Sequence, residues 1–202
     1  MPAPPIEIEA KFVVSGLSPF RDRLQAASAR QTVPCHRETN WRFDRADASL
    51  RAAGDVLRVR QGRENTLTLK APGPDPEHRL EIEVEVDDSD RARLLLEALG
   101  YQVIFVYEKE REVYQLGQAT VMLDELPFGS FVEIEAGDIE LVRAAAATLG
   151  LDWADRVGLT YLGLFETLRA RYDWPATDAT FDALAAFDRP SIDDVMAGVR
   201  GA

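Results

Sequence analysis

Cysteine and histidine are scarce in this sequence. Its 202 residues include one cysteine, Cys35, and two histidines, His36 and His78. A lone cysteine forms no intrachain disulfide, and a zinc site built from cysteine and histidine needs more ligands than these. Any metal ion must therefore be held mainly by carboxylates, which favours hard divalent cations such as Mg²⁺ or Mn²⁺.

Long apolar runs and an excess of positive charge are also missing. The opening Met-Pro-Ala-Pro-Pro has neither the basic start nor the apolar stretch of a signal peptide, and no later run is long enough for a membrane span. The formal net charge is −12, and the acidic residues are spread along the chain. Duplex nucleic acid is therefore a poor partner, and we expect a cytoplasmic protein that binds no membrane.

Alternation of apolar and polar residues is abundant, and it is typical of strands with one apolar face. Several alternating segments are separated by turns too short for parallel crossovers, so we expect antiparallel pairing. The expected strands are residues 6–12, 57–60, 66–70, 80–86, 107–116, 119–126 and 130–136.

Helices are expected where capping signals interrupt this alternation. Ser18 followed by Pro19 predicts a helix start, and Gly100 and Gly150 predict left-handed helix ends. The expected helices are residues 18–29, 88–99, 138–149, 159–172, 179–187 and 191–199. The last two belong to a helical appendage, residues 171–202. It is too short to bury a core alone, so we expect it to pack on the main domain, residues 1–170.

Like charges recur at every second position of several expected strands, where side chains share one face. The pairs are Glu7 with Glu9, Arg58 with Arg60, Lys109 with Arg111, and Glu133 with Glu135. Each face alone could be solvated, as one face of most antiparallel sheets is. Paired like charges repel, however, unless an opposite charge lies between them. Together these faces predict an interior with a basic wall that suits phosphate and an acidic wall that suits metal ions. The apolar faces would then point outward, beneath the helices.

The N-terminal Glu7-Ile8-Glu9-Ala10-Lys11 resembles the Glu-x-Glu-x-Lys of the CYTH superfamily, the triphosphate tunnel metalloenzymes. Further segments follow in that family's order: residues 57–60, 67–70, 79–85, 109–111, 123–125, 131–135 and the Thr-Tyr-Leu-Gly-Leu of 160–164. The resemblance covers about residues 5–168. It implies an α+β fold, in which an eight-stranded antiparallel β-barrel closes into a tunnel with helices packed outside.

The resemblance also implies roles for the matching positions. The expected metal-binding carboxylates are Glu7, Glu9, Glu81, Glu83, Asp124, Glu133 and Glu135. The expected phosphate-binding residues are Lys11, Arg58, Arg60, Arg79, Lys109 and Arg111. Lys70 is the candidate general base if surrounding cations lower its pKa, and a further phosphate contact is the equal alternative.

One stretch, residues 40–44, departs from the family. Some hydrolytic members pair the lysine with a tyrosine, but Asn40-Trp41-Arg42-Phe43-Asp44 contains none. It resembles the Tyr-Phe-Asp of cyclase-like members with Arg42 in place of the tyrosine. The Lys/Tyr arrangement is therefore in doubt, and Trp41 either stacks on an organic group or packs beside the barrel.

Three functions remain open on this resemblance. The favoured one is a metal-dependent triphosphatase acting with water on tripolyphosphate or an organic triphosphate, because no adenine-reading signature is visible. The second is a class IV adenylyl cyclase, in which the ribose 3′-hydroxyl of ATP displaces pyrophosphate. The third is a module that binds triphosphate or polyphosphate without catalysis. Each predicts a triphosphate-containing small molecule or polyphosphate as the partner, and a homodimer is left open.

Overall fold

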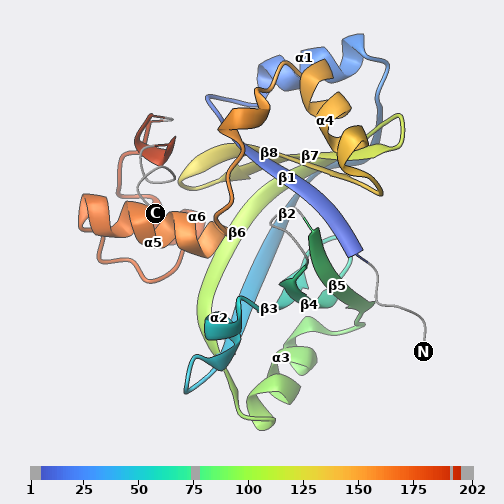
Figure 1. Ribbon diagram of the computed structural model, residues 1–202. Coiled ribbons are helices and arrows are strands. Elements are labelled where there is room, and N and C mark those ends of the chain that lie inside the picture. Colours follow the sequence, from blue (N-terminus) through green and yellow to red (C-terminus); the bar gives the residue numbers. More distant parts are fainter. Residues whose placement is uncertain (1–5, 74–77, 192, 197–202) are drawn as a thin grey trace.

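Eight strands close into an antiparallel barrel in this computed structural model, which describes residues 6–73, 78–191 and 193–196, with the backbone alone at residues 6 and 7. The order around the ring is β1-β5-β4-β3-β2-β6-β7-β8, and β1 pairs with both β5 and β8. The strands are β1 (Ile6–Val14), β2 (Arg30–Arg45), β3 (Val56–Gln61), β4 (Thr66–Pro72), β5 (His78–Glu85), β6 (Tyr101–Leu116), β7 (Ala119–Leu126) and β8 (Gly129–Ala136). The expected α+β fold, a closed eight-stranded barrel with helices outside, is confirmed (Figure 1).

Alternation along each strand separates an outer apolar face from an inner polar face. On β1, Ile8, Ala10 and Phe12 belong to an apolar cluster outside the barrel, while Glu9 and Lys11 line its interior. Buried polar groups destabilise a fold unless they are paired. The interior charges must therefore be balanced by one another or by a ligand.

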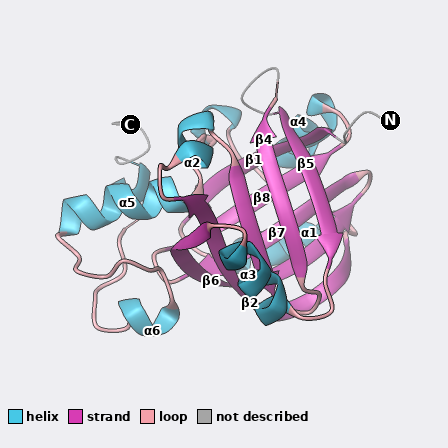
Figure 2. Ribbon diagram, turned by 90° about the horizontal axis from the view of Figure 1, so that it is seen from below, coloured by secondary structure: helices cyan, strands magenta, loops and turns pink. Residues whose placement is uncertain are grey.

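Helices cover the apolar faces. Figure 1 shows α1 (Ser18–Ala26) and α4 (Ile139–Thr148) side by side, and both pack on the outer residues of β1, β7 and β8. Helix α3 (Ser89–Ala98) packs on β3 and β6, at the opposite end of the molecule from these two (Figure 1), and Figure 2 shows the barrel from the side of α3. A short 3-10 turn, η1 (Trp153–Asp155), follows α4. No helix in the described ranges is long and apolar enough to cross a bilayer.

The predicted helix ends are mostly confirmed. Asp88 and Asp138 accept hydrogen bonds from the first backbone N–H groups of α3 and α4. Gly100 and Gly150 follow the two helices with φ of 90° and 64°, which a side chain would strain. At α1 the prediction is wrong: Leu17 occupies the cap position without a side-chain bond, Ser18 is already helical, and the helix ends three residues early.

Strand β2 is the main element that the sequence does not predict. Its first half has no regular apolar alternation, and three register shifts interrupt its pairing with β6. In its second half Trp41 and Phe43 pack outward near α3, whereas Glu38 and Arg42 line the interior. Strand β6 also starts six residues earlier than predicted, because the outer half of β2 extends the ladder to Tyr101.

Helix α2 (Ser49–Ala53) is not predicted either, because its cap comes from upstream. The buried Asp44 carboxylate accepts hydrogen bonds from the backbone N–H groups of Leu50 and Arg51, each at 3.0 Å. The five-residue helix closes the connection between β2 and β3.

One end of the barrel interior is covered by α5 (Tyr161–Tyr172). Phe105 and Phe131 belong to one buried apolar cluster with Phe165 and Leu168 of this helix. The ring centroids of Phe105 and Phe165 are 5.3 Å apart. The N-terminus of α5 therefore faces the charged part of the interior.

The chain after α5 returns to the barrel. Ala179 exchanges backbone hydrogen bonds with residues 106 and 108 of β6, and α6 (Phe181–Leu184) is shorter than the predicted 179–187. Of the predicted helix 191–199, residues 193–196 are helical, and 192 and 197–199 lie outside the described residues. Val195 packs in the same cluster as Ala179. The division into 1–170 and 171–202 stays a prediction.

Candidate functional site

A cavity of about 550 Å³ lies inside the barrel, and charged side chains make up much of its lining. It brings together every predicted site residue whose side chain is described, apart from Asp124. The predicted residues on its wall are Glu9, Lys11, Arg58, Arg60, Lys70, Arg79, Glu81, Glu83, Lys109, Arg111, Glu133 and Glu135. The side chain of Glu7 lies outside the described part of the chain.

Asp124 lies fully buried behind the wall of the cavity. Its Oδ1 accepts a hydrogen bond from Arg111 Nε at 2.6 Å, and its Oδ2 accepts from Arg111 Nη2 at 2.6 Å, Lys109 Nζ at 3.0 Å and Tyr161 OH at 2.9 Å. Four donors fill the acceptor capacity of a carboxylate. Asp124 therefore fixes the positions of two cations that line the cavity.

Glu133 joins two of the predicted phosphate-binding residues. Its Oε2 accepts a short hydrogen bond from Arg111 Nη2, and its Oε1 lies 3.3 Å from Lys11 Nζ. The same Lys11 Nζ lies 4.1 Å from the ring centroid of Tyr161. Burial raises the pKa of Glu133, but Lys11 and Arg111 outweigh burial and hold it well below its ordinary value. Glu133 is therefore ionised at neutral pH.

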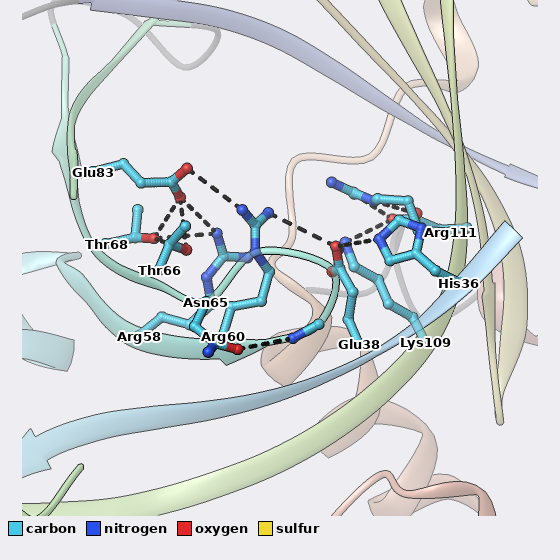
Figure 3. Close-up of polar contacts among 12 residues, drawn as sticks. His36, Glu38, Arg58, Arg60, Asn65, Thr66, Thr68, Glu83, Lys109 and Arg111 are labelled. Carbon is cyan, nitrogen blue, oxygen red and sulfur yellow. Dashed lines mark hydrogen bonds and ion pairs between the residues drawn. The ribbon is translucent and has the colours of Figure 1, made fainter. Parts of the chain in front are cut away.

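Arg58 and Arg60 of β3 face Glu83 of β5 (Figure 3). Arg58 Nη2 lies 3.7 Å from Glu83 Oε2, and Arg60 Nη2 lies 3.5 Å from Oε1. Thr68 and Thr66 donate hydrogen bonds to Glu83 Oε2 at 2.7 and 3.2 Å. Burial raises the pKa of Glu83, but the Thr68 hydrogen bond and the charge of Arg60 outweigh burial, so the pKa lies below its ordinary value. These contacts orient Glu83 between the two arginines.

Lys70 has carboxylates rather than cations at close range. Its Nζ lies 3.3 Å from Glu9 Oε2 and 3.3 Å from Glu81 Oε2. Opposite charges favour the protonated ammonium. The surroundings thus differ from the cationic environment that would make Lys70 a general base.

Glu38 and His36 of β2 also line the cavity, and the sequence does not single them out. Glu38 is 3% exposed, and Figure 3 shows it between His36, Arg60 and Lys109. His36 Nε2 lies 3.3 Å from Oε1, and Lys109 Nζ lies 3.6 Å from Oε2, beyond hydrogen-bond distance. Burial raises the pKa of Glu38, but Lys109 and the His36 hydrogen bond hold it well below its usual range. Recognising β2 as a strand would have revealed these residues.

Arg42 is a third residue of β2 that lines the cavity and was not a predicted site residue, and it is only 7% exposed. Its Nη1 donates a hydrogen bond to Thr160 Oγ1 at 3.4 Å, and its Nε is buried without a hydrogen-bond partner among the described residues. Burial lowers the pKa of Arg42; Tyr107 opposes this, and Arg58 and Arg79 lower it further. Trp41 faces the other way, 4.3 Å from the Arg93 guanidinium, so it packs beside the barrel.

The carboxylates on β1 and β8 fit a hard divalent ion in chemical type. Glu9 lies directly across from Glu135 in the strand register, and Glu133 lies two residues further along the same face. Within the described ranges, no three acidic, histidine or cysteine side chains gather closely enough to hold a metal ion. Glu9 and Glu133 are instead paired with Lys70 and Lys11. Their oxygen donors are those that Mg²⁺ and Mn²⁺ accept.

Known proteins share both the sequence pattern and the fold of this chain. The model of the CYTH domain family matches residues 5–152. No curated protein matches the chain. A candidate adenylate cyclase from Vibrio parahaemolyticus has a similar structure, with 24% identity and a TM-score of 0.71 over 79% of this chain and 97% of that one.

Two other solved structures share the fold. A protein from Pyrococcus horikoshii is 25% identical, with a TM-score of 0.68 over 77% of this chain and 96% of that chain. A candidate adenylyl cyclase from Hippeastrum, described as having a dominant triphosphatase activity, is 18% identical, with a TM-score of 0.60 over 80% of this chain and 95% of its own. The barrel is thus shared by proteins with different descriptions.

Proposed function

This chain belongs to the CYTH domain family, and we propose that it is a divalent-metal-dependent hydrolase of triphosphate compounds. The observation that carries the proposal is the convergence of lysines, arginines and glutamates on one cavity within a closed barrel. The whole chain carries a net charge of −12, so cations concentrated inside it mark a site for a strongly anionic ligand. Guanidinium and ammonium groups stabilise phosphate oxygens most strongly where water is excluded.

The proposed phosphate contacts are Lys11, Arg58, Arg60, Lys109 and Arg111, with Arg79 as a further member. Asp124 and Glu133 hold Lys109 and Arg111 in place through the hydrogen bonds described above. Such preorganisation lets cations stabilise charge that develops during reaction without rearranging first. Lys70 fits the role of a further phosphate contact better than that of a general base, because Glu9 and Glu81 favour its charged form.

The proposed metal ligands are Glu9, Glu133 and Glu135, with Glu7, Glu81 and Glu83 as further acidic residues. Asp124 is a weaker candidate for a ligand than the sequence suggests, because Lys109, Arg111 and Tyr161 already occupy its oxygens. A bound Mg²⁺ or Mn²⁺ would add positive charge beside the phosphate oxygens and help to orient water.

In the proposed reaction, the oxygen of water forms a bond to the terminal phosphorus, and the bond from that phosphorus to the bridging oxygen breaks. Tripolyphosphate and water then yield orthophosphate and pyrophosphate, and the proton of water is shared among the phosphate products. The chain contributes position and charge, since phosphoryl transfer needs little covalent help from a protein. Lys109 and Arg111 are placed to stabilise the phosphate oxygens as charge shifts onto the leaving group.

A cyclase reaction needs the same phosphate contacts and, in addition, a pocket that holds adenine. The described lining of the cavity contains no asparagine, glutamine or tryptophan side chain, and Trp41 packs on the outer face. The fold does not decide the matter, because similar structures carry both descriptions. The absence of amide and indole side chains from the described lining supports the hydrolase.

Product analysis tests the proposal. Purified protein would be incubated with Mg²⁺ or Mn²⁺ and with tripolyphosphate, ATP or thiamine triphosphate in parallel, and the products separated by anion-exchange chromatography. Orthophosphate release supports the hydrolase. Cyclic AMP with pyrophosphate from ATP would identify a cyclase, and tight binding without any product would identify a binding module.

A further inference from the structure

Arg42 differs from Lys109, Arg111 and Arg60 because, among the described residues, no acidic side chain contacts it. Lys109 and Arg111 contact Asp124, and Arg60 lies near Glu38 and Glu83. Around Arg42, the only hydrogen-bond partner within the described ranges is the Thr160 hydroxyl, at 3.4 Å, although the side chain is 93% buried (7% exposed). A buried cation without a counter-charge destabilises the fold. Its presence therefore points to an anion that binds beside it.

The neighbours of Arg42 add positive charge. Arg58 is its direct partner in the β2–β3 register, and Arg79 lines the same cavity. Arg79 Nη2 donates a hydrogen bond to the Gly54 carbonyl oxygen at 3.0 Å, and its Nε is buried without a partner in the described part of the chain. Repulsion within this group lowers the pKa of Arg42 in addition to the effect of burial.

The N-terminus of α5 meets the cavity at the same place. Residues 158–162 line the cavity, and Thr160 caps this twelve-residue helix by accepting a hydrogen bond from Gly163 N at 3.2 Å. The first backbone N–H groups of a helix have no intrahelical acceptor, and they carry the positive end of the helix dipole. The guanidinium of Arg42, whose Nε has no hydrogen-bond partner among the described residues, and the start of α5 thus face one region, where an anion would find several donors.

We propose that Arg42 and the first turn of α5 form a subsite for an unesterified phosphate end, which makes inorganic tripolyphosphate the preferred substrate. This inference rests on the proposed triphosphatase function and names its substrate class. Arg42 lies four residues along β2 from Glu38, about 13 Å by the rise of a strand. The Arg42 end of the subsite therefore lies away from the contact between Glu38 and Lys109, whereas Tyr161, the first residue of α5, donates a hydrogen bond to Asp124.

Chemistry distinguishes the two classes of substrate at this position. The far end of tripolyphosphate is a free phosphate group with several charged oxygens, which a guanidinium can bind through two parallel hydrogen bonds. In ATP the corresponding phosphate is esterified, carries one fewer ionisable oxygen, and adds a bulky nucleoside. Because Arg42 lacks an acidic partner among the described residues, binding of the more highly charged free phosphate is favoured over binding of the esterified one.

The test compares Arg42→Gln and Arg42→Lys with the matched control Arg51→Gln. Arg51 lies close enough to influence Arg42, but its side chain is exposed and paired with Glu166 at 2.7 Å. Dissociation constants for tripolyphosphate and ATP would be measured by titration calorimetry, and KM and kcat for both by phosphate release, with Mg²⁺ present. Thermal unfolding without ligand checks the fold of each variant.

We expect Arg42→Gln to raise Kd and KM for tripolyphosphate at least about 10-fold, as for a lost hydrogen bond to a charged group, and those for ATP less than about 2-fold. Arg42→Lys should recover part of the loss, and Arg51→Gln should change neither. Equal weakening for both ligands, or no weakening, would overturn the subsite. If the wild type binds tripolyphosphate in this selective manner yet hydrolyses nothing, the proposed function fails and the subsite stands.

Discussion

The cations inside the barrel fall into two groups. Lys109 and Arg111 contact Asp124, Glu38 or Glu133 within 3.6 Å, whereas Arg42 has only a hydroxyl partner among the described residues. In the first group, the balanced cations, the protein supplies the counter-charge, so these cations are held in place without a ligand. In the second group, the unbalanced cations, the counter-charge must come from a ligand. Charge balance, more than the presence of an arginine, therefore shows where an anionic ligand is needed.

The largest expected effect is on stability and comes from the balanced group. Asp124→Asn keeps the size of the side chain but removes the charge that balances Lys109 and Arg111. Breaking a buried ion pair by removing one partner destabilises by about 3–5 kcal/mol. Urea unfolding followed by circular dichroism measures this loss. A change below about 1 kcal/mol would mean that Asp124 does not balance these cations.

The next effect is on catalysis. Glu133→Gln removes a proposed metal ligand and the carboxylate that joins Lys11 to Arg111. We expect kcat to fall about 10²–10³-fold, the range for the loss of one electrostatic group in an active site. The control is Glu125→Gln, because Glu125 contacts Ser130 and Arg189 and is not part of the cavity lining. Unchanged phosphate release by Glu133→Gln would refute the metal assignment.

A smaller effect, of opposite sign, distinguishes the unbalanced group. Arg42→Gln removes a buried cation that lacks an acidic partner, so unfolding of the ligand-free protein should occur at an equal or higher temperature. Added tripolyphosphate should stabilise the wild type more than the variant, because the stabilisation that a ligand provides rises with its affinity. Differential scanning fluorimetry measures both. A clear loss of stability without ligand would place Arg42 with the balanced cations.

The smallest effect concerns His36, at the edge of the balanced group. The hydrogen bond to Glu38 raises the pKa of His36 above its ordinary value, although burial opposes this. The contact therefore stabilises the fold fully below the ordinary histidine pKa of about 6.5, and this contribution is lost as pH rises through the raised value. Relative to His36→Gln, the wild type should gain less than about 1 kcal/mol at acidic pH and nothing at alkaline pH. A pH-independent difference would contradict this origin.

The sequence predicts the strands whose charges alternate in pairs, and these strands carry nearly all of the predicted site. Arg58 with Arg60 and Lys109 with Arg111 are examples in which period-two alternation alone places both side chains on one face. The closed order of the ring, by contrast, came from family resemblance, because pairing between β1 and β5 depends on contacts distant in sequence.

What the sequence does not predict lies mainly on β2. Its first half contains register shifts between Gln31 and His36, and residues 37–40 are all polar, so no apolar alternation indicates that Glu38 and Arg42 share one face. The contact between Lys70 and Glu9 also escapes prediction, because Glu9 lies on β1, two strands away from β4 around the barrel. Charge balance is a property of the assembled barrel and cannot be read from one segment.

The most direct test of the central claim is ³¹P NMR of the wild-type protein with tripolyphosphate and Mg²⁺ in ¹⁸O-labelled water. If the cations hold tripolyphosphate so that water attacks its terminal phosphorus, the products are orthophosphate and pyrophosphate in equal amounts. The isotope is then found in the orthophosphate. Isotope in the pyrophosphate would place the attack at the central phosphorus and contradict the proposed orientation. No cleavage of tripolyphosphate, with cyclic AMP formed from ATP instead, would contradict the account as a whole.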